Sequence, residues 1–326
     1  MRIAVTGSIA TDHLAVFPGR FTDHLIPDQL DRVSLSFLAD TLEIRRGGVA
    51  ANVAVGLARL SLTPVLVGAV GKDFTEYAAW LHNTGVDTAL HMSDTRHTAR
   101  FMCTTDAEHN QIATFYAGAM AEARHISLAS VFGRTGTPDL VLIAPNDPEA
   151  MLRHTKECRS LALPFAADPS QQLARLDRAE SRALVTGARF LFTNEYETAL
   201  LLERTGWTRQ TVLDQVGTWI STRGAEGVHL MRRAEETRHI PSLPAREPVD
   251  PTGVGDAFRA GFLAAAAQGR PLEQSARLGC ALATLVLESV GTQDYKIVPG
   301  DLLRRIADAY GSEQATALEP LLEDVP

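Results

Sequence analysis

The stretch that decides the fold class covers residues 140–168 and reads LVLIAPNDPEAMLRHTKECRSLALPFAAD. Two short apolar runs, at 140–144 and 164–168, flank a segment at 148–161 that reads as a helix. The same alternation continues along the chain, with strands predicted at 2–6, 64–70 and 190–193 and helices at 49–60, 74–84, 177–186 and 195–204. Apolar runs separated by helices are typical of a parallel sheet that is buried on both faces. We therefore predict an α/β protein with an open, doubly wound, mainly parallel sheet and helices on both faces.

Two segments, 10–46 and 97–116, break this alternation. They contain short runs with alternating polar residues, at 33–37, 41–45, 98–104 and 111–116. We predict that these runs form a small antiparallel β-sheet that stands off the core as a lid. The alternative is two long loops, which compact domains seldom contain. With the lid included, residues 1–326 are predicted to form a single domain.

Composition restricts the partners and the compartment. The chain has 326 residues, is 45% hydrophobic and carries a formal net charge of −8. An acidic chain has no general electrostatic reason to bind nucleic acid or anionic lipid, and no apolar run approaches the ~20 residues of a membrane span. The cysteines Cys103, Cys158 and Cys280 are odd in number and form no CxxC pair, which is typical of reduced thiols. We expect a cytoplasmic protein without nucleic-acid or membrane partners.

The stretch DPTGVGDAFRAGF at 250–262 carries the clearest chemistry. Gly253 and Gly255 flank Val254, Asp256 follows at once, and a helix is predicted at 257–267. Glycines before a helix let backbone N–H groups converge, and the helix N-terminus adds partial positive charge. This predicts an anion hole suited to a phosphoryl group, beside which the Asp256 carboxylate can accept the proton of an attacking hydroxyl. The alternative is an Asp that only complements the helix dipole.

Three further clusters are weaker signals. RGGVAAN at 46–52 is a glycine-rich helix start that allows close backbone approach to a ligand. NEYE at 194–197 fits either a capping box or a contact to metal or phosphate. STRGAEG at 221–227 fits either a nucleotide groove or a tight hairpin. GAVGKD at 68–73 lacks the Walker spacing, and the first strand is followed by no GxGxxG, which argues against a P-loop protein and a dinucleotide oxidoreductase.

In this order, the clusters resemble the ribokinase-like (PfkB) family of carbohydrate and nucleoside kinases. The 250–262 stretch resembles its C-terminal signature, 47–52 its N-terminal signature, 194–197 its N-x-x-E motif and 68–73 its G-x-x-G-x-D turn. One departure is Val254, where the family usually has a small residue. More narrowly, the chain resembles the actinobacterial adenosine kinases, on the strings GSIATDH (7–13), VSLSF (33–37), ADPSQQ (167–172) and VGTQ (290–293).

This resemblance implies roles for individual residues. The implied nucleoside pocket consists of Ser8, Asp12, Ser36, Gly48, Asn52, Phe101, Phe115 and Gln172. Within it, Asp12 would hold the ribose hydroxyls, Phe101 and Phe115 would stack on the purine, and Gln172 would read the base edge. In structural terms, Asp12 could instead cap a turn, and the two Phe could be packing residues.

The resemblance also implies the cofactors. The residues implied for ATP are Asn194, Thr222, Gly224 and Gly227. Glu197 would organise Mg²⁺ through water, and the backbone carbonyls around Asp250 and Thr252, with the loop at 290–292, would form a site for a monovalent cation such as K⁺. Asp256 would be the general base, with Gly253, Val254 and Gly255 as the anion hole.

The resulting hypothesis is an adenosine kinase that transfers the γ-phosphoryl group of ATP to the adenosine 5′-hydroxyl and yields AMP and ADP, a purine-salvage reaction. The alternatives are a kinase of ribose, fructose, guanosine or inosine, and a non-catalytic binding protein on the same scaffold. Lid sheets with exposed edges often pair, which predicts a homodimer formed through the lid.

Overall fold

The computed structural model describes residues 1–25, 32 and 34–325. Among these residues the main sheet contains the strands β1 (Ile3–Thr6), β4 (Val65–Gly71), β5 (Asp87–Ser93), β8 (Leu140–Ile143), β9 (Phe165–Ala167), β10 (Phe190–Asn194), β11 (Thr218–Thr222), β12 (Val228–Met231) and β13 (Arg238–Ile240). Their spatial order is β13-β12-β11-β10-β9-β8-β1-β4-β5. All neighbours from β11 to β5 pair in parallel, whereas β12 and β13 pair antiparallel at one edge. The predicted mainly parallel sheet is confirmed.

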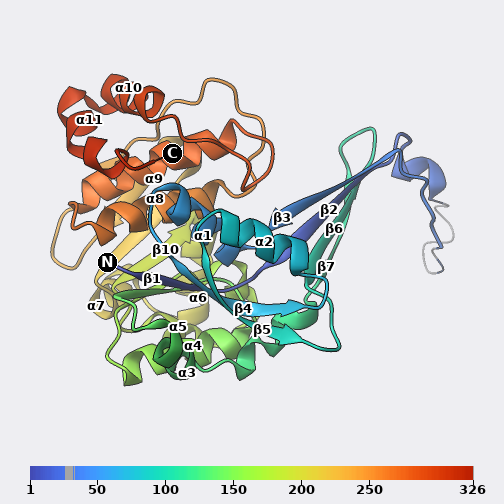
Figure 1. Cartoon of the computed structure of the whole chain (residues 1–326), viewed down its shortest axis with the longest axis horizontal. Helices are drawn as coiled ribbons and strands as arrows, with labels where there is room; N and C mark the ends of the chain where they lie inside the picture. The colour runs from blue at the N-terminus through green and yellow to red at the C-terminus, as the bar shows by residue number, and fades with distance from the viewer. Residues whose placement is uncertain (26–31, 33, 326) are drawn as a thin grey trace.

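Helices cover both faces of this sheet (Figure 1). One face packs against α1 (Val49–Arg59), α2 (Thr75–Asn83), α8 (Val254–Ala267), α9 (Leu272–Leu287), α10 (Pro299–Tyr310) and α11 (Ser312–Leu318). The other face packs against α3 (Leu128–Thr135), α4 (Pro148–Ser160), α5 (Arg178–Val185), α6 (Glu195–Thr205) and α7 (Arg209–Gln215). No helix in the described part of the chain is long and apolar enough to cross a membrane.

Strand residues alternate between two hydrophobic cores. In β8, Leu140 and Leu142 pack into the core beneath α1 and α8, while Val141 and Ile143 pack into the core beneath α3 and α4. All four side chains have 0% relative exposure. Because successive side chains point to opposite faces and both faces are covered, the strand reads as a continuous apolar run.

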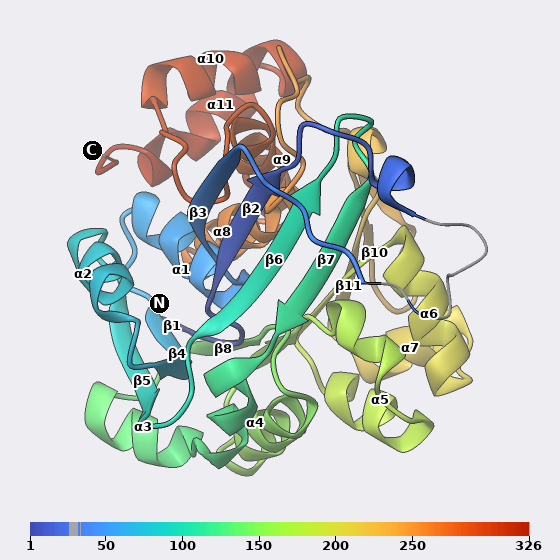
Figure 2. The ribbon, with the colours of Figure 1, turned by 90° about the vertical axis from the view of Figure 1, so that its right-hand side faces the viewer.

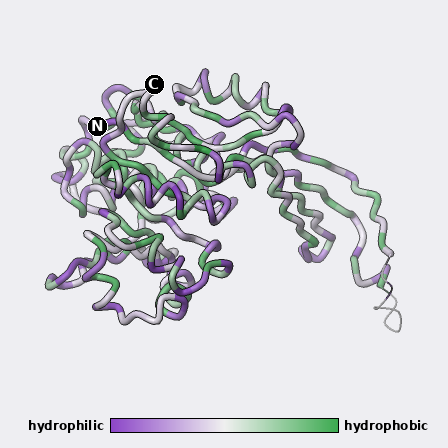
Figure 3. The backbone as a smooth tube through the Cα atoms, turned by 90° about the horizontal axis from the view of Figure 1, so that it is seen from below, coloured by the Kyte–Doolittle hydropathy of each residue, from purple (hydrophilic) through white to green (hydrophobic). Residues whose placement is uncertain are grey.

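A second, smaller sheet projects away from this body (Figures 1 and 3). Its strands are β2 (Ala10–Val16), β3 (Thr41–Gly47), β6 (Ala99–Thr105) and β7 (Gln111–Tyr116), in the order β3-β2-β6-β7. The predicted separate small sheet is confirmed, but it is not wholly antiparallel, because β2 and β6 pair in parallel.

The strand predicted at 33–37 is wrong. Residues 34–37 have no regular secondary structure, and residue 33 lies outside the described residues. The edge position is filled instead by β3, which pairs with β2 from Ala10↔Gly47 to Val16↔Thr41 and leaves 17–40 as the connection. Sequence alternation did not identify β2, although it is a central strand of the small sheet.

The turn after β4 fixes the small sheet to the body. Asp73 accepts hydrogen bonds from the Thr98 backbone N–H and hydroxyl, both at 2.8 Å, and from Arg100 at 2.6 Å. The Thr98 hydroxyl also accepts from the Gly71 N–H at 3.0 Å. These bonds hold the start of β6 against the end of β4, which places the small sheet over one edge of the body (Figure 2).

Candidate active site

A cleft of about 610 Å³ lies where the small sheet meets the body. Its lining residues are Ser8, Ala10, Asp12, Gly48, Val49, Asn52, Phe101, Phe115, Ala117, Met120, Pro145, Gln171, Gln172, Arg175, Thr252, Gly253, Asp256 and Thr292. Ser8 follows the carboxyl end of β1 and Pro145 that of β8. In the sheet, β1 lies between β4 and β8, so the strand order changes direction at β1. Doubly wound sheets bind ligands at such a switch point.

One row of side chains crosses the small sheet toward the cleft. Strand pairing places Arg45, Asp12, Phe101 and Phe115 side by side on β3, β2, β6 and β7. Asp12 and both Phe line the cleft, and Phe115 is 51% exposed. Phe101 lies between Asp12 and Phe115 in this row, and the half-exposed Phe115 ring is accessible to a ligand in the cleft. This arrangement favours a flat ligand with hydroxyl groups.

The opposite wall is the start of α8. Gly253 is its N-cap, with φ 77°, and a Cβ at this position would lie 2.7 Å from the Thr292 methyl group. Only glycine therefore fits this turn. The first N–H groups of α8 have no partner within the helix, and they follow a glycine that lines the cleft. The turn thus leaves helix N–H groups beside the cleft, and the anion hole stays a prediction. The helix α8 begins at Val254, three residues before the predicted helix start.

Asn52 binds Asp256 across 204 residues of sequence. Its Nδ2 donates to Asp256 Oδ2 at 2.8 Å, while its Oδ1 accepts from the Thr292 hydroxyl at 2.9 Å and from Gln293 Nε2 at 2.8 Å. Gln293 Oε1 in turn accepts from the Trp80 ring N–H at 3.1 Å. Because two donors occupy Asn52 Oδ1, its NH₂ group must face the Asp256 carboxylate. The network orients the carboxylate in the cleft.

Burial raises the pKa of Asp256 to about 6, although the Arg259 charge and the Asn52 hydrogen bond both act to lower it. Burial likewise raises the pKa of Asp12 to about 6, against the neighbouring Arg45 charge. A carboxylate with a pKa near 6 is mostly ionised at neutral pH yet basic enough to accept a proton. Asp256 therefore has the position and the basicity of a general base.

A buried ion pair lies behind the glycine turn. Arg259, one turn along α8 from Asp256, donates to Asp168 Oδ1 at 2.6 Å, and the Asp168 side chain is fully buried. The Arg259 guanidinium also lies 5.6 Å from the Phe192 ring centroid. Burial raises the pKa of Asp168 to about 7 despite this partner. The pair was not predicted, because nothing in either local sequence indicates the other residue.

The N-x-x-E segment forms a capping box at the start of α6. The Asn194 N–H donates to Glu197 Oε2 and the Glu197 N–H donates to Asn194 Oδ1, both at 2.8 Å. No cluster of three or more His, Cys, Asp or Glu side chains in the described chain could hold a metal ion. Mg²⁺ in kinases is commonly held by one or two carboxylates together with water and substrate phosphates. A single carboxylate such as Glu197 fits that mode.

The carboxylate of Asp250 is already engaged. It accepts from the Thr252 N–H at 2.9 Å and the Gly291 N–H at 3.3 Å, and it pairs with Arg45 at 3.4 Å. Although burial acts in the opposite direction, the hydrogen bonds from Thr252 and Gly291 hold the pKa of Asp250 below its ordinary value. A monovalent cation here would therefore share Asp250 with a guanidinium.

Some of the predicted site residues lie outside this cleft. Ser36 is exposed and does not line the cleft; it lies in the connection between β2 and β3. Thr222, Gly224 and Gly227 lie at and after the carboxyl end of β11, beside the Asn194 end of β10. The structure thus brings the nucleoside residues together, apart from Ser36, and sets the expected ATP residues further along the same sheet edge.

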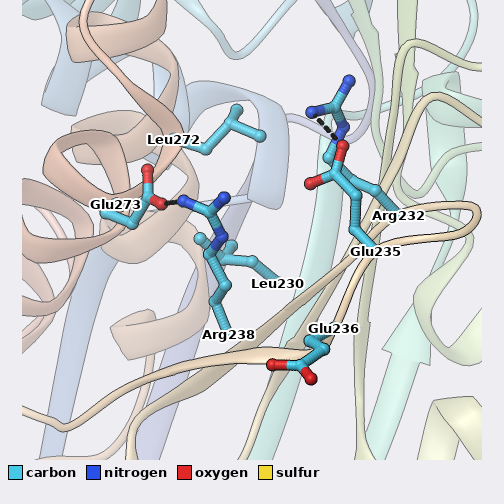
Figure 4. Close-up of a pocket in the computed structure, with 7 residues that line it drawn as sticks. All are labelled: Leu230, Arg232, Glu235, Glu236, Arg238, Leu272 and Glu273. Atoms are coloured by element: carbon cyan, nitrogen blue, oxygen red, sulfur yellow. Dashed lines mark ion pairs between the residues drawn. The ribbon is translucent and has the colours of Figure 1, made fainter.

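A second pocket, of about 170 Å³, lies between the β12–β13 hairpin and the start of α9. Figure 4 shows four of its charged side chains in two pairs, Arg238 with Glu273 and Arg232 with Glu235 at 2.7 Å, and Glu236 outside both pairs. It contains none of the predicted site residues. Sequence reasoning missed Arg175 in the cleft. It quoted Gln293 only within the string at 290–293 and missed that this residue orients Asn52, because a glutamine that orients an asparagine has no local signature.

Comparison with known proteins gives a consistent family. Residues 12–298 match the model of the pfkB family of carbohydrate kinases. The nucleoside kinase of Methanothermobacter thermautotrophicus is 31% identical over 308 residues, which cover 93% of this chain and 97% of the relative. The structure of Burkholderia thailandensis nucleoside kinase in complex with ADP-inosine is 31% identical, with a TM-score of 0.78 and coverage of 95% and 96%. The adenosine kinase from Sinorhizobium meliloti, 20% identical with a TM-score of 0.72 and coverage of 97% and 98%, shares the fold.

Proposed function

This chain belongs to the pfkB family of carbohydrate kinases, and from that premise we propose that it is an ATP-dependent adenosine kinase. The observation that carries the phosphotransferase assignment is the Asp256 carboxylate, which lines the cleft beside the N-terminus of α8. The observation that favours a nucleoside over a free sugar is the aromatic pair on the small sheet, Phe101 and Phe115. A free sugar has no flat base on which these rings could stack.

The chemical step follows from this geometry. The adenosine 5′-hydroxyl loses its proton to Asp256 as its oxygen bonds to the γ-phosphorus. The bond from that phosphorus to the β–γ bridging oxygen breaks, and the electron pair leaves with ADP. Backbone N–H groups at Gly253 to Gly255 stabilise the charge on the transferring group. Glu197 would hold Mg²⁺ through water, and the ion would supply further neutralisation of the phosphates.

The small sheet acts as the lid over the acceptor. Asp12 binds the ribose hydroxyls, the two Phe rings stack on the base, and the side-chain amide of Gln172 reads its edge. Gln172 is 7% exposed and lines the cleft. An amide can donate or accept, so it fits a 6-amino or a 6-oxo purine. The choice of adenosine rests on the resemblance of the strings at 7–13, 33–37, 167–172 and 290–293.

The ATP residues and the cations belong to the same proposal. Asn194, Thr222, Gly224 and Gly227 line the path of ATP along the carboxyl ends of β10 and β11. The backbone carbonyls around Asp250 and Thr252 would hold K⁺, and the ion would stiffen the anion hole. The three free cysteines fit a reducing compartment such as the cytoplasm.

We also propose a homodimer formed through the small sheet. Strand pairing places its outward face opposite to the Asp12 row, and this face carries Leu42 and Ile44 (both 62% exposed), Met102 (39%) and Ile112 (47%). Exposed apolar residues grouped on one face of a sheet favour association. Light scattering of the purified protein tests this, with a monomer at micromolar concentration as the contradicting result.

The decisive test of the function is ADP release from ATP·Mg²⁺ across a panel of adenosine, guanosine, inosine, ribose and fructose. The proposal predicts the highest kcat/KM for adenosine. A higher kcat/KM for inosine or guanosine would support a nucleoside kinase but reject adenosine as the preferred acceptor. A higher value for ribose or fructose would reject the role of the aromatic pair. No ADP release above the acceptor-free rate would reject the enzyme.

A further inference from the structure

The cleft contains more acidic than basic side chains, although the proposed reaction brings negative phosphates into it. In the described part of the chain, the charged side chains that line it are Asp12, Asp256 and Arg175. Phosphoryl transfer brings several negative phosphate oxygens to the same place, and kinases place a positive side chain there as well as backbone dipoles. The three lysines of the chain, Lys72, Lys156 and Lys296, do not line the cleft. A cationic partner for the γ-phosphoryl group must therefore be an arginine.

Two neighbouring arginines are already paired. Arg259 is buried, forms its 2.6 Å ion pair with Asp168 and does not line the cleft. Arg45 pairs with Glu43 and Asp250 and lines an adjacent cavity. Arg45 would have to leave a carboxylate to reach a phosphate. Arg259 bonds Asp168 through one amino group while the other lies against Gly255, and moving it into the cleft would leave Asp168 unpaired in the core.

Arg175 differs from both. It is exposed, it lines the cleft, and no ion pair with a carboxylate is formed by its side chain within the described residues. Its backbone is fixed, because the Arg175 N–H donates to the Gln172 carbonyl at 2.9 Å and its flanking residues Leu173 and Leu176 are 0% and 2% exposed. The short helix η4 (Ser170–Ala174) that precedes it also supplies Gln171 and Gln172 to the cleft. The segment thus presents an uncompensated guanidinium to the cleft from an anchored base.

We propose that Arg175 is a catalytic residue that binds the γ-phosphoryl oxygens of ATP from the side opposite the glycine turn at 253–255. This inference rests on the proposed phosphotransferase function. A guanidinium binds phosphate through two parallel hydrogen bonds, which a lysine ammonium cannot reproduce. Arg175 keeps its protons throughout the transfer; it holds the phosphoryl group in line and neutralises the charge that develops on it. Asp256 remains the group that accepts the proton.

The test compares the wild-type protein with Arg175→Gln and Arg175→Lys, and with Arg178→Gln as a matched control. Arg178 is also an exposed arginine, three residues along the chain, and it does not line the cleft. Two readouts are taken on each protein: kcat with adenosine and ATP·Mg²⁺, and the calorimetric affinities for ADP and for the β,γ-imido analogue of ATP. The two nucleotides differ by the γ-phosphoryl group, so their comparison isolates the proposed contact.

We expect Arg175→Gln to lower kcat by about 10²–10³-fold. Its affinity for the imido analogue should fall by about tenfold or more, the value of a charge-assisted hydrogen bond, while its ADP affinity stays unchanged. Arg175→Lys should recover part of kcat, and Arg178→Gln should match the wild type. The inference is overturned if Arg175→Gln binds the analogue as tightly as the wild type does, or loses analogue and ADP affinity equally. If the wild type transfers no phosphoryl group, the proposed function fails, and the nucleotide comparison still decides the role of Arg175.

Discussion

Replacing Asn52 by Ala should move the acidic limb of the pH–rate profile to higher pH. Asn52 donates to Asp256 Oδ2 at 2.8 Å, and this bond helps to hold down a pKa that burial raises to about 6. A hydrogen bond to a charged group contributes about 1.5–3 kcal/mol, and one pKa unit corresponds to about 1.4 kcal/mol. The pKa of Asp256 should therefore rise by about 1–2 units in the variant.

The sign of the effect follows from the role of the carboxylate. A general base works when it is deprotonated, so activity is lost as the pH falls through its pKa. The assay is kcat/KM for adenosine between pH 5 and pH 9, because this parameter reports the pKa values of the free enzyme. The midpoint of the acidic limb should move from about 6 in the wild type to about 7–8 in the variant. Both profiles should level off at high pH. A second titration near 6 is expected from Asp12 in both proteins.

A second variant separates this effect from any contact between Asn52 and the acceptor. Gln293 is fully buried and does not line the cleft, yet its Nε2 fixes the orientation of Asn52 at 2.8 Å. Gln293→Leu should therefore shift the limb in the same direction by a smaller amount. An unchanged midpoint in both variants, or a shift to lower pH, would refute the assignment of the limb to Asp256.

Three further predictions concern stability and specificity. Asp256→Asn should raise the free energy of unfolding, measured by urea titration, by roughly 1–3 kcal/mol at pH 8, because the pKa of Asp256 in the folded protein (about 6) exceeds that in the unfolded chain. The gain should vanish at pH 4, and a loss of stability at pH 8 would contradict the prediction. Arg259→Met should lower the free energy of unfolding by about 3–5 kcal/mol, since it leaves Asp168 buried without a partner. If the Asp168→Asn/Arg259→Met double variant is no more stable than Arg259→Met, the unpaired Asp168 charge is not the cause of the loss. Phe101→Ala should raise KM for adenosine by about tenfold through lost stacking and leave any ribose turnover much less affected, and an equal loss for both acceptors would reject base stacking.

The main sheet could be predicted from the sequence because its signal is local. Each strand at 140–144, 164–168 and 190–193 is apolar on both faces, since two cores cover it. The small sheet gave a weaker signal. The run at 33–37 has the same alternation as a strand, but its described residues, 34–37, pair with no strand in the described part of the chain. In contrast, β2 mixes Asp12 and His13 with apolar residues and is ordered by its two neighbours.

The site residues, too, could be predicted only where their signal is local in the sequence. Asp256 could be singled out because two glycines and a helix start lie next to it in the sequence. Asn52 was also singled out by its glycine-rich helix start, but its bond to Asp256 was not predicted, because the two residues are distant in sequence. The support of Asn52 by Gln293 and the pairing of Arg259 with Asp168 have no local signature at all. Asn194 and Glu197 form the capping box, one of the two interpretations of their motif. Their contact to ATP or a metal ion stays a prediction.

The central claim is that Asp256 takes the proton of the acceptor hydroxyl, and turnover of Asp256→Asn tests it most directly. Asn preserves the shape of the side chain and can still accept the hydrogen bond from Asn52, so the site should remain assembled. We expect kcat to fall by about 10²–10⁴-fold while the dissociation constant of adenosine changes little. A variant that turns over adenosine at a near-normal rate would contradict the account.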